Sequence, residues 1–290
     1  MKFYTKDEIF DRVKEFLADN PNGVVEILGS TASGKTGLSI EIARFLEQEK
    51  CSIEVISVDS RQVYKDCDIS SAKITEEEME GVPHWGLNLV ALTEDYSVFD
   101  FQQYAFTKIE EIQSRGNVPI LCGGTMLWLD AVSENFVFGE KEIEDETSPV
   151  VEFEKSQQRG TPKWPVLKIG LHWERDTLYE RINYRAQLQF EGGLLEETEG
   201  ILKQYSLTDG NWFDCKFSDR VVRIANDPSK PLLARNVSSS FGYAELAAYF
   251  SNIISYDEAL ELNRKRNRNY AKRQATWWRG REDVLWLKCG

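Results

Sequence analysis

The sequence predicts an α/β fold built on a parallel sheet flanked by helices, and two patterns carry that prediction. Apolar runs rich in β-branched residues lie at 24–28, 53–58 and 118–122, and each ends at a polar or glycine turn. Helical patterns lie between these runs at 36–48 and 100–114. Strands that alternate with helices are joined by right-handed crossovers into a parallel sheet. With 290 residues, the chain has room for one large α/β unit and a smaller appendage.

In the first half of the chain, capping residues and glycines mark where the predicted helices and strands begin and end. Thr5 and Glu8 form a capping-box pattern, which opens an amphipathic N-terminal helix. Apolar positions 101, 105, 109 and 112 lie on one face of a helix, which Gly116 closes. The strand at 118–122 then runs into Gly123-Gly124-Thr125. We expect residues 1–133 to form the first part of the core.

The second half is less regular. Residues 134–165 are acidic, contain three prolines and show no periodicity, which predicts a loop or linker. We expect a strand at 166–171, helices over 175–205, 243–249 and 257–281, and a closing strand at 284–288. Residues 206–240 show no legible pattern. We therefore assign 166–290 to the return of the chain to the core, followed by C-terminal helices that form a small, mainly helical appendage.

Composition indicates a soluble cytoplasmic protein. The hydrophobic share of 41% and aromatic share of 12% are typical of a packed globular core. No apolar run is long enough to span a membrane, and the N-terminus does not read as a signal peptide. The five cysteines are scattered and there are only two histidines, so we do not expect a zinc site. We expect the protein to reside in the reducing cytoplasm. We expect a monomer.

The charge is unevenly distributed along the chain. A net charge of −13 argues against a protein that coats nucleic acid indiscriminately. Residues 139–154 are strongly acidic, whereas residues 264–281 carry eight basic residues and no acid: Arg264, Lys265, Arg266, Arg268, Lys272, Arg273, Arg279 and Arg281. A chain polarised in this way can bind RNA locally.

One eight-residue stretch predicts a phosphate site. It fits the pattern G-x-x-x-x-G-K-[ST], between a buried strand and a helix, and comprises Gly29, Ser30, Thr31, Ala32, Ser33, Gly34, Lys35 and Thr36. Backbone N–H groups and the positive end of a helix dipole would surround one anion there. Lys35 would reach the outer phosphate and the Thr36 hydroxyl would hold Mg²⁺. The fold expected is therefore P-loop NTPase-like.

A carboxylate follows the next strand, because the run at 53–58 ends at Asp59-Ser60. At that edge of an α/β sheet, Asp59 could assist Mg²⁺, accept a proton from a nucleophile, or only cap a turn. We find no Walker B aspartate at the end of a later strand, which argues against a motor ATPase or switch GTPase. A small transferase is favoured.

The basic C-terminal segment has two interpretations. Lys265, Arg268, Lys272 and Arg279 share one side of a helix, and Trp277 and Trp278 lie among them. Basic residues with interleaved aromatics could follow a phosphate backbone and stack on a base. The alternative is a solvated face whose tryptophans anchor the helix. His84 and His172 lack ligand-like neighbours and are expected to be structural.

These residues together resemble a known family. The matching segments run in order along the chain: Gly29–Thr36, Ser57–Tyr64, Asp68–Lys73, Val82–His84, Tyr96–Phe101, Pro119–Leu127, Gly242-Tyr243, Ile254–Ala259 and Ala271–Gly280. In this order they resemble the tRNA dimethylallyltransferases, also called isopentenyltransferases. The resemblance is dense over 25–132, clear over 242–288 and looser over 166–203.

The resemblance implies transfer of a prenyl group from dimethylallyl diphosphate to the exocyclic amine of an adenine beside the tRNA anticodon, in the anticodon stem-loop. The phosphate loop would then hold the diphosphate, with Mg²⁺ on Thr36, and Asp59 would be the general base. The expected catalytic residues are Asp59, Lys35 and Thr36. The expected contacts to adenine or tRNA are Asp59, Ser60, Arg61, Gln62, Thr125, Lys272, Arg273, Gln274 and Arg279.

The chain departs from the family pattern in two places. Ser239 stands where the family has an arginine before the Gly-Tyr pair, and Lys73, Arg61 or Arg235 could substitute for it. The insertion after the Gly-Gly-Thr helix is short, as in the adenylate isopentenyltransferases, which prenylate free AMP, ADP or ATP. Ala225–Pro228 looks like an inserted family segment but lies too late in the chain. The alternatives are therefore an adenylate isopentenyltransferase, a degenerate homologue that only binds, or an ordinary P-loop kinase.

Overall fold

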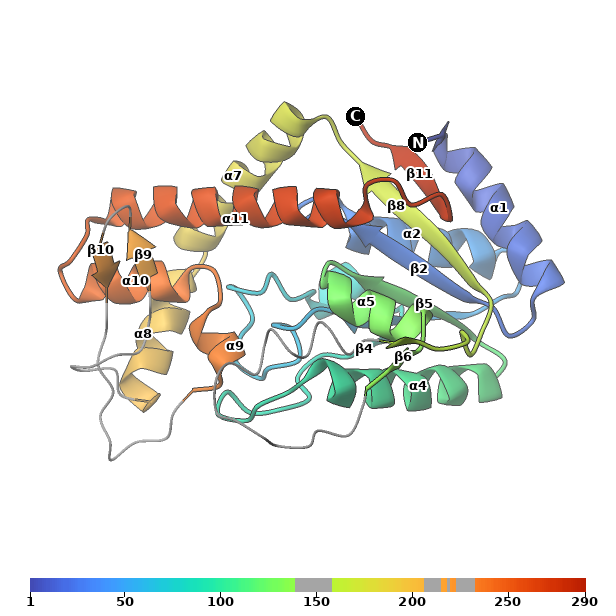
Figure 1. Cartoon of the computed structure of the whole chain (residues 1–290), viewed down its shortest axis with the longest axis horizontal. Helices are drawn as coiled ribbons and strands as arrows, with labels where there is room; N and C mark the ends of the chain where they lie inside the picture. Colours follow the sequence, from blue (N-terminus) through green and yellow to red (C-terminus); the bar gives the residue numbers. More distant parts are fainter. Residues whose placement is uncertain (139–157, 206–214, 218–219, 223–232) are drawn as a thin grey trace.

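A sheet of seven parallel strands forms the centre of the computed structural model, which describes residues 1–138, 158–205, 215–217, 220–222 and 233–290 (Figure 1). Each neighbouring pair of strands is parallel. From one edge to the other, the strands are β1 (Phe3–Tyr4), β11 (Val284–Lys288), β8 (Val166–His172), β2 (Val24–Gly29), β5 (Val118–Gly123), β3 (Ile53–Val58) and β4 (His84–Trp85). The prediction of a parallel sheet flanked by helices is confirmed.

Helices cover both faces of this sheet. On one face, α1 (Lys6–Asp19) and α2 (Lys35–Glu47) pack with Val25 and Ile27 of β2. On the other face, α4 (Val98–Ser114) and α5 (Met126–Ser133) pack with Val24 and Leu28 of the same strand. Successive side chains of a strand point to opposite faces, so β2 is buried on both sides. This explains why the central strands appear in the sequence as continuous apolar runs.

The strands and helices predicted in the first half are present, with small differences at their ends. The capping box of Thr5 and Glu8 opens α1, as expected. Helix α4 begins two residues earlier than 100, because Ser97 and Asp100 form a second capping box. Strands β1 and β4 were not predicted, since two residues are too short to show periodicity. A short helix, α3 (Glu76–Met79), lies between β3 and β4.

The prediction of a loop or linker over 134–165 is wrong at two short stretches, where strands form. Strand β6 (Phe136–Val137) pairs in antiparallel register with β7 (Gln158–Arg159). All of the strongly acidic residues 139–154 lie outside the described residues. The helical region predicted over 175–205 consists of two helices, α7 (Arg175–Glu191) and α8 (Leu194–Tyr205). Gly193 separates them with φ of +107°, a conformation that favours glycine.

A mainly helical appendage lies at one end of the molecule, as predicted. It contains α8, α9 (Arg235–Ser238), α10 (Tyr243–Phe250) and an antiparallel pair, β9 (Cys215–Phe217) and β10 (Arg220–Val222) (Figure 1). Helix α7 runs towards this end and α11 (Tyr256–Trp278) returns from it along the sheet (Figure 1). The segment Ala225–Pro228 lies outside the described residues. Every helix in the described part of the chain is too short or too polar to cross a bilayer.

Candidate active site

The loop between β2 and α2 forms the phosphate-binding turn that the sequence predicts. Gly34 lies immediately before α2 with φ of +94°, a left-handed conformation that explains the glycine at this position. No side chain caps the start of α2. Its first backbone N–H groups are therefore available to an anion, which the helix dipole would also stabilise.

Lys35 folds back over the turn that carries it. Its Nζ donates to the backbone carbonyls of Gly29, at 3.0 Å, and of Ser30, at 2.9 Å. The pKa of Lys35 is lowered to about 8, mainly by burial and in part by the nearby guanidinium of Arg185, whereas Cys122 and Asp59 oppose the shift. An anion bound in the turn would stabilise the charged form of this lysine.

Two cavities meet at this turn. The first, here called the loop cavity, has a volume of about 400 Å³ and is lined by Ala32, Ser33, Gly34, Lys35, Thr36, Arg181, Tyr184, Arg185 and Leu188. The second, here called the Asp59 cavity, has a volume of about 640 Å³. Thr31, Asp59, Ser60, Arg61 and Thr125 are among its lining residues. Arg185 lines both cavities and connects them.

Two arginines of α7 reach the phosphate turn, and neither was predicted as a site residue. Arg185 donates from Nη2 to the Thr31 hydroxyl, and Arg181 donates from Nε to the carbonyl of Ala32, at 2.9 Å. They stand four residues apart, so they lie on the same face of the helix. That spacing predicts the shared face from the sequence, but it does not show that the face meets the phosphate turn.

Asp59 lies at the end of β3, where the sequence predicts it. Its Oδ1 accepts a hydrogen bond from the backbone N–H of Arg61, at 2.9 Å. The next residue, Ser60, donates its backbone N–H to Oγ1 of Thr125, at 3.0 Å. Because Thr125 follows β5, this bond joins the ends of two adjacent strands. The structure thus brings Asp59, Ser60 and Thr125 together, with the Asp59 cavity beside them.

The glycine pair before Thr125 allows three elements to pack closely. A Cβ at Gly123 would lie 2.1 Å from the carbonyl oxygen of Val58, and a Cβ at Gly124 would lie 2.6 Å from Nε2 of Gln274. Gln274, which is buried in α11, donates to the carbonyl of Gly124 at 2.8 Å and accepts from the backbone N–H of Thr31 at 2.8 Å. Gln274 therefore holds the phosphate turn against the end of β5.

The basic residues of α11 separate onto two sides of the helix. Arg266, Tyr270 and Arg273 line the Asp59 cavity. Lys272 and Arg279 instead line a third cavity of about 400 Å³, which also contacts Gly29 and Ser33 of the turn. The four predicted contacts in this helix and at its C-cap therefore have different surroundings. Arg273 lines the Asp59 cavity, Gln274 is buried between the phosphate turn and β5, and Lys272 and Arg279 line the third cavity.

Tyr270 is a further polar group beside Asp59. Its hydroxyl donates to the carbonyl of Gly124, at 3.1 Å. Burial, with a contribution from the charge of Asp59, raises the pKa of Tyr270 to about 12. The hydroxyl therefore stays protonated at neutral pH and acts as a donor.

The surroundings of Ser239 show which cation lies where the family has an arginine. Nη2 of Arg61 donates to the Ser239 hydroxyl, at 3.1 Å. Arg266 donates to the Ser239 carbonyl at 3.2 Å and forms an ion pair with buried Glu245 at 2.6 Å. Lys73 is held elsewhere by Tyr64, Asp68 and Asn88. The side chain of Arg235 lies outside the described residues. Of the three candidates, Arg61 is the one seen at Ser239.

Comparison with known proteins gives consistent matches. A family model described as IPP transferase matches residues 62–152 and 141–281. Proteins named tRNA dimethylallyltransferase from Bacillus subtilis strain 168 and Streptococcus sanguinis strain SK36 are 31% and 32% identical to this chain. These alignments cover 91% and 92% of this chain, and 90% and 92% of those proteins.

A solved structure agrees with these sequence matches. The full-length tRNA isopentenylpyrophosphate transferase of Bacillus halodurans has a TM-score of 0.71 against this chain at 30% identity. That comparison covers 92% of this chain and 90% of the other. The phosphate turn, the aspartate at the end of β3 and these matches lead to one conclusion: the chain belongs to the IPP transferase family.

Proposed function

We propose that this protein transfers a dimethylallyl group from dimethylallyl diphosphate to the exocyclic amine of an adenosine next to the anticodon of a tRNA. The observation that carries the proposal is the pair of cavities that meet at Arg185. The loop cavity contains the uncapped start of α2, which suits a diphosphate. The Asp59 cavity contains a carboxylate, which suits an amine. The names of the relatives support tRNA as the acceptor.

The residues of the loop cavity would bind the diphosphate of the donor. The N–H groups at the start of α2, together with Lys35 and Arg185, would stabilise the negative charge that grows on this leaving group. Thr36 lies exposed in the same cavity and would contribute one oxygen ligand to Mg²⁺. The diphosphate would supply further oxygens, and the bound cation would help to neutralise the leaving group.

Asp59 would act on the acceptor. The amine nitrogen attacks C1 of the allylic donor, so a C–N bond forms as the bond from C1 to the diphosphate oxygen breaks. The amine loses a proton, which Asp59 would accept as general base. The prenylated adenosine and the diphosphate are the products. Ser60 and Thr125 hold the backbone beside Asp59 and fix the end of β3.

The acceptor would be an extruded base of the anticodon stem-loop, because a stacked base cannot reach an aspartate in a cavity. Arg61, Arg266 and Arg273 line that cavity and would meet the RNA phosphates. We expect the enzyme to act as a monomer in the cytoplasm. Free AMP, ADP or ATP is the alternative acceptor.

Prenyl transfer from labelled dimethylallyl diphosphate tests the proposal directly. The purified protein is incubated with Mg²⁺ and either an unmodified tRNA anticodon stem-loop or AMP. We expect label in the stem-loop only. Label in AMP only would identify an adenylate isopentenyltransferase. Label in neither acceptor, with binding retained, would identify a homologue that binds without turnover.

A further inference from the structure

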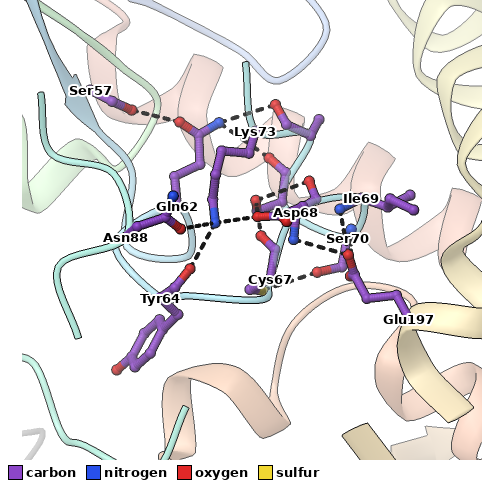
Figure 2. A network of polar contacts seen from close by, with 12 residues as sticks. Ser57, Gln62, Tyr64, Cys67, Asp68, Ile69, Ser70, Lys73, Asn88 and Glu197 are labelled. Carbon is purple, nitrogen blue, oxygen red and sulfur yellow. Dashed lines mark hydrogen bonds and ion pairs between the residues drawn. The ribbon is translucent and has the colours of Figure 1, made fainter. Parts of the chain in front are cut away.

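The loop at residues 67–73 forms one wall of the Asp59 cavity, through Ser70 and Ser71. It carries no catalytic group, yet four polar side chains hold it in place, three of which Figure 2 shows. These three are Gln62, Lys73 and Glu197. Lys73 is the last residue of the loop, Gln62 precedes the loop in sequence, and Glu197 comes from α8, in the helical appendage. The fourth, Gln189 of α7, donates to the carbonyls of Ile69 at 2.5 Å and Ser70 at 3.4 Å.

Glu197 binds three successive backbone amides of this loop. Its carboxylate accepts hydrogen bonds from the N–H groups of Asp68 at 2.9 Å, Ile69 at 2.7 Å and Ser70 at 3.1 Å (Figure 2). Consecutive N–H groups that converge on one oxyanion form an anion-binding nest. Hydrogen bonds to an ionised acceptor are about twice as strong as those between neutral groups. The loop therefore takes its shape around this carboxylate.

A fourth donor links the same carboxylate to α10. The Tyr243 hydroxyl donates to Oε1 of Glu197, at 2.6 Å. Burial raises the pKa of Tyr243, and the neighbouring Cys67 and Glu197 raise it further, so the hydroxyl stays protonated. Tyr243 is 1% exposed and belongs to the core that includes Leu194 of α8. Glu197 thus joins two helices of the appendage to the cavity wall.

The end of the loop at residues 71–73 is held by residues near strand β3 of the central sheet. Lys73, whose side chain is 6% exposed, donates to the Tyr64 carbonyl at 2.8 Å, to Asp68 at 2.5 Å and to Asn88 at 2.6 Å (Figure 2). Gln62 donates to the carbonyls of Ser71 and Ala72 and accepts from Ser57 of β3. With this end anchored to the core, the position of Ser70 depends on Glu197, which binds its N–H, and on Gln189 of α7, which binds its carbonyl.

We propose that Glu197 is a positioning residue for the acceptor: it sets the wall of the Asp59 cavity according to the position of α8 and α10. The inference rests on the proposed function, since it assigns the cavity to the adenosine. The loop cavity, at the phosphate turn between β2 and α2, has no lining residue from 67–73. Binding of the diphosphate donor should therefore be independent of Glu197.

Steady-state kinetics of Glu197→Gln provide the test, with Glu196→Gln as the matched control. Glu196 is the exposed neighbour in the same helical turn, so its substitution makes the same charge change without touching the loop. For Glu197→Gln we expect kcat/KM for the stem-loop to fall about tenfold to a hundredfold, mainly through KM, as expected for a misplaced pocket wall. KM for dimethylallyl diphosphate should stay unchanged. Glu197→Asp keeps the charge and should recover part of the loss.

Three outcomes would count against the inference. In an active protein, equal KM values for RNA in the Glu196 and Glu197 variants would overturn it. A proportional change in KM for both substrates would indicate general structural damage instead. If Glu197→Gln does not fold, Tyr243→Phe removes a single donor, and an unchanged RNA KM in that variant would also overturn the inference. Wild-type transfer to the stem-loop is measured first, and its absence would refute the proposed function itself.

Discussion

In the proposed reaction, proton removal from the amine depends on Asp59. Asparagine has nearly the same shape, and its side-chain oxygen can still accept the hydrogen bond from the N–H of Arg61, but it cannot take a proton at neutral pH. We expect Asp59→Asn to lower kcat by about a hundredfold or more. Single-turnover transfer of labelled prenyl groups measures the effect, and thermal unfolding checks that the fold is retained. A wild-type rate would exclude Asp59 as the base.

Lys35 gives the donor site a pH dependence. Its pKa of about 8 in the free protein means that the charge is present below pH 8 and is lost above it. In the proposed function the charged form binds the diphosphate, so kcat/KM for the donor should fall by up to tenfold per pH unit above about 8. Arginine keeps its charge over this range, so Lys35→Arg should flatten the fall. An identical pH profile in the variant would assign the pH dependence to another group.

How much of the site could be predicted depends on how far apart its residues lie in the chain. Gly29–Thr36, Asp59 and Thr125 follow three strands directly, and parallel strands bring their carboxyl ends to one edge. Arg185 and Glu197 come from helices, and only tertiary packing decides what a helix face meets. Gln274 was predicted to contact the RNA because it matches the final helix of the family that the sequence resembles. Its buried bonds to Thr31 and Gly124 could not be inferred from its neighbours.

At the scale of elements, apolar runs and capping signals were sufficient to predict the long strands and helices. The sheet strands β2, β3, β5, β8 and β11 are present where runs of apolar residues predict them. The short strands β1 and β4 exist because neighbouring strands offer unpaired edges, a property of the assembled sheet. The division between α7 and α8 was missed, although Gly192-Gly193 marks it in the sequence.

Strand β2 carries a buried carboxyl group that makes stability depend on pH. Glu26 is fully buried on the face covered by α5, and burial raises its pKa to about 7, while Lys168 and Ser133 limit the rise. The folded state therefore holds this proton to higher pH than the unfolded state, whose pKa is near 4.5. The stability of the wild type should fall as pH rises from about 4.5 through 7.

Glu26→Gln tests this dependence, because glutamine has the same size and does not ionise. Relative to wild type, the variant should gain free energy of unfolding between pH 5 and pH 8, by on the order of 3 kcal/mol at most. Lys168 keeps its ion pairs with Asp283 and Glu134 in the variant. Urea unfolding at the two pH values measures the difference. A difference that does not change with pH would contradict the assignment to Glu26.

For the molecule as a whole, RNA must bind to a protein of net charge −13 through a local cationic surface. Arg273 lies at the Asp59 cavity, so Arg273→Gln should weaken stem-loop binding and reduce the salt slope of log K by about one unit. Lys14 of α1, which is paired with Glu49, provides a matched control, and Lys14→Gln should leave the slope unchanged. Equal slopes for both variants would remove Arg273 from the RNA-binding surface.

The place of β11 in the sheet has a consequence for synthesis of the protein. This strand, made of residues 284–288, lies between β8 and β1, which come from the middle and the start of the chain. A nascent polypeptide can assemble β8, β2, β5 and β3 early, but one edge of β8 stays unpaired until residues 284–288 leave the ribosome. During that interval the N-terminal strand has no partner to dock against. Translational stalling near residue 280 would therefore leave an exposed β8 edge open to aggregation.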